Sequence, residues 1–128
     1  MFEKEFLDLD LLKRIRNLGF DEPCLAYWAI PLQKEGEPRI IIGDGGINTP
    51  VDMMYIPAPL IQQVIKWFIS KNYLLYVEIF ADKTFDYTIV SDNFAEEFEY
   101  DDGPFQIFEE AQISGIKRMI EELEDERR

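Results

Sequence analysis

Three pairs of neighbouring acids are the residues of this sequence best suited to bind a metal ion. They are Glu96-Glu97, Asp101-Asp102 and Glu109-Glu110, and hard cations such as Ca²⁺ and Mg²⁺ prefer clustered oxygen ligands. The alternating Asp/Asn pattern of a calcium-binding loop is missing, however. We therefore interpret the pairs first as a solvated acidic surface, with a cation site and a protein-recognition surface as the alternatives.

A glycine-rich segment, Gly43-Asp44-Gly45-Gly46, has the composition of a loop that could surround a phosphate group. A nucleotide-binding loop also needs a Lys or Ser/Thr at a fixed spacing and an entry into a helix, and Asp44 would repel phosphate. The segment instead predicts a tight turn after a strand, with the glycines at positive φ.

The sequence contains no histidine, which excludes Ser/His and Cys/His nucleophile pairs and imidazole metal ligands. Catalysis would have to rest on carboxylates, Lys, Tyr or a metal held by oxygens. A metal-dependent enzyme that uses Asp44, Asp52 or the acidic pairs is therefore one alternative. Our prediction is a protein without enzyme activity, with no cofactor, no catalytic residue and no metal ligand.

Negative charge is concentrated in the C-terminal half of the chain. The net charge is −13; residues 1–72 carry ten acids and eight bases, whereas residues 73–128 carry sixteen acids and five bases. This distribution disfavours direct binding to nucleic acid or to an anionic membrane, because counterions would have to be recruited and not released. We expect the partner to be a protein, and a cationic one fits this charge best.

The segment from Asp92 to Glu110 contains eight acids and no base. This run suggests a second hypothesis, that the surface imitates the charge of DNA and inhibits a basic nucleic-acid-binding protein. Mimicry requires a phosphate-like spacing of carboxylates in three dimensions. The aromatic residues lack interleaved Lys and Arg, so we interpret them as core and not as base-stacking platforms; they include Tyr27, Trp28, Trp67, Phe68, Tyr73 and Tyr76.

Length and composition predict one globular domain over residues 1–128. Apolar residues make up 47% of the 128 residues, enough for a hydrophobic core in spite of the large net charge. No stretch reaches the roughly 20 apolar residues that cross a bilayer, and the N-terminus does not resemble a signal peptide, so we expect a cytoplasmic protein. Cys24 is the single cysteine and is predicted to be a small buried hydrophobe.

Periodicity of apolar residues predicts three helices and four strands. The helices are expected at residues 8–18, at 58–71, and from 104–107 to about 123; the strands at 24–30, 39–42, 73–80 and 84–90. The loop 43–57 and the acidic connection 91–104 fit neither period. This order, α-β-β-α-β-β-α, predicts an α+β fold with a four-stranded, largely antiparallel sheet and helices packed on one face. The almost wholly apolar strand 73–80 is expected to be central.

Three segments carry a resemblance to a known group of proteins. They are LGFDEPCLAYW, IPAPLIQQVIKWFISKNYLLYVEI and FEEAQISGIKRMIEEL, and they span most of the chain. In these segments the chain resembles small uncharacterised α+β proteins encoded by phages and prophages of gut bacteria. The matching residues are Gly19, Phe20, Asp21, Pro23 and Cys24, then Trp67 and Phe68, then Glu109, Glu110 and Ala111. The resemblance implies an origin on a mobile element and a binding role, and it supplies no catalytic motif.

The sequence thus favours a noncatalytic phage or prophage accessory protein that binds another protein. Its contact surface would be the acidic residues of the C-terminal half or the loop 43–57, and a homodimer is a further alternative if that loop is apolar and exposed. The candidate interaction surface consists of Asp44, Asp52, Glu96, Glu97, Glu99, Asp101 and Asp102.

Overall fold

The computed structural model describes residues 5–32, 36–42, 53–91, 96–99 and 103–127. The chain divides into two compact units, Met1–Ile61 and Gln62–Arg128, which we describe one after the other. The expectation that the whole chain acts as one domain stays a prediction.

The first unit contains a three-stranded antiparallel sheet. Its strands are β1 (Ala26–Pro31), β2 (Arg39–Ile42) and β3 (Met53–Ala58), and β1 lies in the middle, in the order β2-β1-β3. The register pairs Ala26 with Ile42 on one side and with Ala58 on the other. The strands predicted at residues 24–30 and 39–42 are therefore present, and they pair with each other antiparallel.

Helix α1 (Leu9–Asn17) precedes this sheet in the chain, close to its predicted bounds. Asp8 caps its start, because its Oδ1 accepts a hydrogen bond from the backbone N–H of Leu11 at 3.0 Å. The helix ends where Gly19 adopts a φ of 105°, a left-handed conformation that favours glycine. The backbone N–H of Phe20 then donates to the carbonyl of Ile15 at 3.0 Å, and the Phe20 side chain is buried as a result.

A small apolar cluster holds the first sheet to the segment before α1. Its buried members are Phe6, Ala26, Ile40 and Ala58, with Trp28 and Leu60 packed against it. The Trp28 indole N–H donates to the carbonyl of Leu7 at 3.1 Å, so the indole keeps a hydrogen bond while its ring packs against the cluster.

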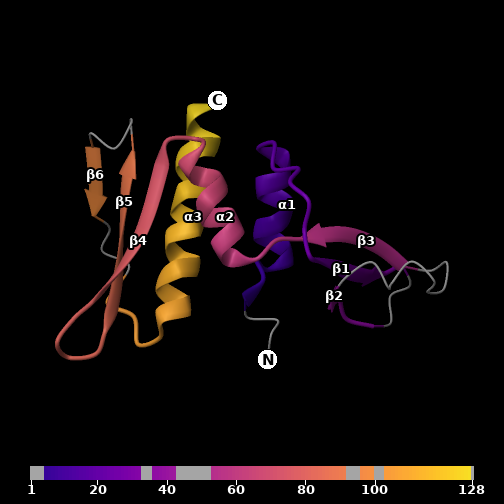
Figure 1. The fold of residues 1–128 in the computed structure, drawn as a ribbon, viewed down its shortest axis with the longest axis horizontal. Helices are drawn as coiled ribbons and strands as arrows, with labels where there is room; N and C mark the ends of the chain where they lie inside the picture. Colours follow the sequence, from indigo (N-terminus) through magenta and orange to yellow (C-terminus); the bar gives the residue numbers. More distant parts are fainter. Residues whose placement is uncertain (1–4, 33–35, 43–52, 92–95, 100–102, 128) are drawn as a thin grey trace. The chain divides into compact units, whose positions relative to one another are not determined.

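The second unit contains a second three-stranded antiparallel sheet and a long helix. Strands β4 (Tyr73–Ile79), β5 (Phe85–Ser91) and β6 (Glu96–Glu99) follow helix α2 (Ile61–Ile69), and β5 lies in the middle of the order β4-β5-β6. Helix α3 (Phe108–Glu126) closes the chain and packs along β4 and β5, as Figure 1 shows.

One face of the second sheet forms the core of this unit with α3. Tyr73 and Leu75 of β4 and Tyr87 and Ile89 of β5 alternate along their strands, and all four side chains are buried. Gly115 of α3 lies against Leu75. The buried side of the helix carries Ala111, Gln112, Gly115, Ile116, Met119, Ile120 and Leu123.

The α+β class is confirmed, but the predicted four-stranded sheet is wrong. The four predicted strands fall into two sheets, and each sheet contains a third strand: β3 joins β1, and β6 joins β5. Pro57 hid β3 from the sequence pattern, because proline has no N–H for a ladder and fits only an edge strand. Three of the four residues of β6 are glutamates, and glutamate is depleted in strands.

Two further expectations are corrected. The strand 73–80 was expected to be central, but β4 lies at the edge of its sheet, since β5 pairs with strands on both sides. Helix α2 begins at Ile61 and not at residue 58, because the chain up to Ala58 pairs with β1 and Leu60 bridges to Phe6. Within the described ranges, no helix combines the length and the apolar character needed to span a bilayer.

Candidate functional site

The predicted acidic surface falls largely outside the described part of the chain. Asp44, Asp52, Asp101 and Asp102 lie outside the described residues, as does most of the loop 43–57. The remaining three candidates, Glu96, Glu97 and Glu99, lie in β6, for which the backbone alone is described.

The register of β6 separates these three glutamates into two rows. Glu97 pairs with Val90 and Glu99 with Thr88, whereas Glu96 pairs with Ser91. Residues that alternate along a strand belong to the same face of a sheet. The positions of Glu97 and Glu99 are therefore those of the face opposite α3, and the position of Glu96 belongs to the row of the α3 side.

We call this face opposite α3 the outer face of the second sheet. Tyr76 is 38% exposed and Glu78 is exposed, while Leu74 and Val90 are half-buried. The described positions of the outer face on β4 and β5 are Leu74, Tyr76, Glu78, Asp86, Thr88 and Val90, which form three cross-strand pairs. Tyr76 was expected to be a core residue, and this expectation is wrong because it lies on the face that α3 does not cover.

The charged residues that β4 and β5 contribute to the outer face are both acids, Glu78 and Asp86. Thr88, which is buried in the middle strand, donates its hydroxyl to Oε1 of Glu78 at 3.4 Å. Oδ1 of Asp86 accepts the backbone N–H of Tyr87 at 2.9 Å. Glu78 is exposed and bonded to Thr88, whereas Asp86 is half-buried and bonded to the backbone of its own strand. Both carboxylates add negative charge near Tyr76, which can attract a cationic group.

The remaining predicted acidic pair, Glu109-Glu110, lies exposed in the first turn of α3. Acids in this position stabilise the helix through its dipole. Among the described residues, no group of three or more acidic, cysteine or histidine side chains is arranged to hold a metal ion.

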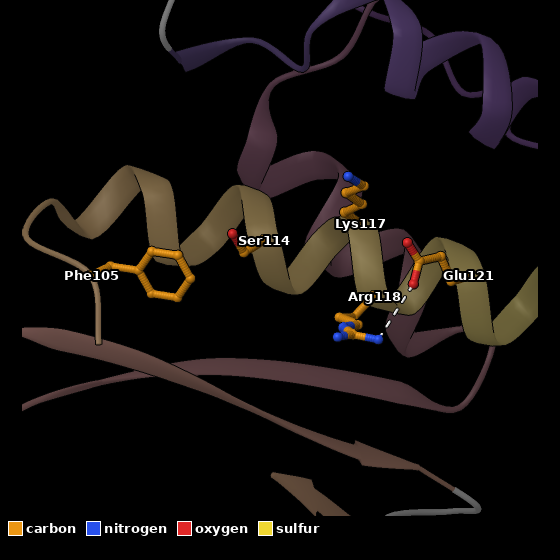
Figure 2. Close-up of a pocket in the computed structure, with 5 residues that line it drawn as sticks. All are labelled: Phe105, Ser114, Lys117, Arg118 and Glu121. Carbon is orange, nitrogen blue, oxygen red and sulfur yellow. Dashed lines mark ion pairs between the residues drawn. The ribbon is translucent and has the colours of Figure 1, made fainter. Parts of the chain in front are cut away.

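A pocket of about 370 Å³ lies beside α3 in the second unit. We call it the α3 pocket. Four of the residues that line it, Ser114, Lys117, Arg118 and Glu121, are spaced at i, i+3, i+4 and i+7, which places them on one stripe of the helix. Figure 2 shows Phe105 at one end, Ser114 in the middle, and the side chains of Lys117 and Arg118 spread apart toward the other end. Its described lining is Phe105, Ser114, Lys117, Arg118 and Glu121.

The guanidinium of Arg118 forms an ion pair with the carboxylate of Glu121, with 3.6 Å between Nη1 and Oε2. Both side chains are more than a third exposed, so this pair contributes little to stability. Both partners line the α3 pocket.

Asp82, in the turn between β4 and β5, was not singled out from the sequence. Its Oδ1 accepts two hydrogen bonds from Thr84, at 2.6 Å from the hydroxyl and at 3.1 Å from the backbone N–H. These bonds favour the carboxylate form and lower the pKa of Asp82 below its ordinary value.

Cys24 differs from its expected environment. It is half-buried, not fully buried, and its thiol donates to the carbonyl of Glu22 at 3.3 Å. The cause is its position just before β1, which begins at Ala26. Pro23 and Leu25, on either side of it, are exposed.

No family model, curated protein or solved structure matches the chain. The resemblance to phage and prophage proteins therefore stays a prediction.

The α3 pocket is the feature that sequence reasoning missed. Its signal was present in the helical spacing of Ser114, Lys117, Arg118 and Glu121. In the sequence, however, such a spacing fits the solvated side of an amphipathic helix equally well.

Proposed function

We propose that the chain is a noncatalytic module that binds a protein with a basic surface on the outer face of the second sheet. The observation that carries this proposal is the composition of that face: exposed Tyr76 lies beside Glu78 and Asp86, and no base is present at its described positions. The register adds the backbone positions of Glu97 and Glu99 to the same face.

The chemistry of this face matches what protein interfaces use. Aromatic residues such as tyrosine are enriched in the centre of interfaces, where they supply contact area at low entropic cost. Surrounding charges steer a partner of opposite sign and increase the association rate. Most of the net charge of −13 is carried by residues 73–128, which include this face, and it adds to this steering.

Two double variants with equal charge test the proposal. Glu78→Lys with Glu97→Lys changes the outer face, while Glu109→Lys with Glu110→Lys changes exposed acids of α3. Each variant raises the net charge by four units, from −13 to −9. Thermal unfolding of both variants is compared with that of the parent chain, so that a loss of binding is not mistaken for a loss of fold.

The chain is immobilised and used to capture proteins from its source cells. Capture is carried out at an ionic strength of about 50 mM and again at about 500 mM, where the Debye length is several-fold shorter than the diameter of a typical protein. We expect a basic partner that the outer-face variant loses and the α3 variant retains. Equal losses with both variants, or capture that does not change with salt, would contradict docking on this face.

A further inference from the structure

Charge is segregated along α3. The helix carries seven acids and two bases, and both bases, Lys117 and Arg118, line the α3 pocket. Glu121 is the single acid in the described lining, and the other six acids of the helix lie elsewhere on it. The described lining therefore carries a net charge of +1 in a chain whose overall charge is −13.

Two polar groups of the pocket have no partner among the described residues. The ammonium of Lys117 forms no ion pair and the hydroxyl of Ser114 forms no hydrogen bond within the described part of the chain. The guanidinium of Arg118 is held by Glu121, and its planar group has five N–H donors in a fixed geometry. The pocket thus offers hydrogen-bond donors of the kind that bind carboxylate and phosphate oxygens.

The opposite end of the pocket is apolar and fixed in place. Phe105 exchanges two backbone hydrogen bonds of 2.8 Å with Phe85 of β5, which attaches it to the sheet. Its ring lies 6.2 Å from the ring of Tyr87, at an interplanar angle of 33°. Phe105 is half-buried, so part of its ring remains available for contact with an apolar group.

We propose that the α3 pocket binds a small molecule that carries a carboxylate or phosphate group on an apolar ring. The anionic group would interact with Lys117 and Arg118, and the ring with Phe105. The volume of about 370 Å³ lies within the range of small-molecule sites. This site is separate from the outer face, which lies on the opposite side of the sheet from α3.

The test is a titration followed by ¹H–¹⁵N NMR spectra of the full chain at low ionic strength. Phenyl phosphate and benzoate are the probes, inorganic phosphate tests the anion without the ring, and benzyl alcohol tests the ring without the charge. We expect saturable shifts centred on residues 114–121 and Phe105 for at least one charged aromatic probe. The charged aromatic probe that binds more tightly identifies the anionic group. Inorganic phosphate, which lacks the ring, and benzyl alcohol, which lacks the charge, should bind more weakly.

Matched variants test the role of each end. Lys117→Ala should weaken binding of the stronger probe about two- to fivefold, the range expected for one exposed charge pair. Lys66→Ala removes the same charge from an exposed site on α2 and should leave the affinity unchanged. Phe105→Leu should weaken binding of the aromatic probe but not that of inorganic phosphate.

Three outcomes would overturn the proposal. The first is the absence of a saturable shift with either charged aromatic probe at up to about 10 mM. Binding would then be weaker than a Kd of 1 mM, which corresponds to about −4.1 kcal/mol. The second is an equal effect of Lys117→Ala and Lys66→Ala, which would indicate a nonspecific charge effect. The third is binding of benzyl alcohol as tight as that of the charged probes, which would leave the cations without a role.

Discussion

Gly115 of α3 packs directly against Leu75 of β4, and a side chain at position 115 would overlap the Leu75 side chain. Gly115→Ala should therefore lower the free energy of unfolding by about 1 kcal/mol. Overpacking a core costs about 1–3 kcal/mol, whereas the better helix propensity of alanine returns about 1 kcal/mol. Chemical denaturation of the two proteins measures the difference.

The control is the same change in a Leu75→Ala background. Removing the leucine leaves room for the new methyl group, so Gly115→Ala should then raise the free energy of unfolding by about 1 kcal/mol, through helix propensity alone. A loss of stability of the same size in both backgrounds would show that the contact with Leu75 is not the cause.

Two tyrosine hydroxyls in the structure have opposite environments. The hydroxyl of Tyr55 in β3 is buried and has no hydrogen-bond partner among the described residues, whereas that of Tyr73 donates to Oε1 of Glu126 at 2.5 Å. A buried unpaired polar group costs about 1–3 kcal/mol. Tyr55→Phe should therefore raise the free energy of unfolding by about 1 kcal/mol, and Tyr73→Phe should lower it by about as much.

Urea denaturation of both tyrosine variants provides the measurement. Each variant removes one oxygen atom and nothing else, so each serves as the control for the other. A decrease in stability for Tyr55→Phe would mean that its hydroxyl has a partner in solution.

Asp8 and Asp10 give a matched pair at the start of α1. The carboxylate of Asp8 caps the helix through the N–H of Leu11, while Asp10 lies exposed within the first turn. Asp8→Ala should cost about 1 kcal/mol of stability. Asp10→Ala removes the same charge and should cost less than half as much, since it weakens the interaction with the helix dipole alone. Equal costs in thermal unfolding would argue against the cap.

The carboxyl of Asp82 should titrate below the ordinary range of an aspartate, because the hydroxyl and the N–H of Thr84 bond to its charged form. A lowered pKa in the folded protein means that this contribution to stability is present above the pKa of the unfolded chain. It is lost as the pH falls through the folded value.

Thr84→Val removes the hydroxyl and keeps the backbone N–H. The pKa of Asp82, followed by the NMR shift of its carboxyl carbon, should therefore rise in this variant but stay below its ordinary value. An unchanged titration would assign the whole effect to the backbone bond.

Local chemistry explains why much of the fold could be predicted. The apolar stripe, the cap at Asp8 and the glycine at position 19 specify α1 within a residue of its observed bounds. Strands β1, β2, β4 and β5 were visible because at least half of the residues in each are aromatic or β-branched. What the pattern could not supply was the pairing of β3 and β6, since both contain residues that disfavour strands and are ordered by their hydrogen bonds to β1 and β5.

The candidate sites were harder to predict for a related reason. The acids of β6 were identified from the sequence, but the register that places Glu97 and Glu99 in one row and Glu96 in another depends on β5. The α3 pocket depends on Phe105, which the backbone of Phe85 brings beside the helix. Contacts of this kind are created by the fold and cannot be predicted from the spacing of residues in a single sequence.

The pairing of the described strands has a consequence for the order in which the chain can fold during synthesis. Every observed strand pair joins segments of the same unit, and the first sheet is complete at Ala58. Its ladder of hydrogen bonds can therefore form while the ribosome is still adding the second unit, since domains tend to fold from the N-terminus as they emerge. Translation pauses placed after the codons of α2 would then change the yield of native protein less than pauses placed between β2 and β3.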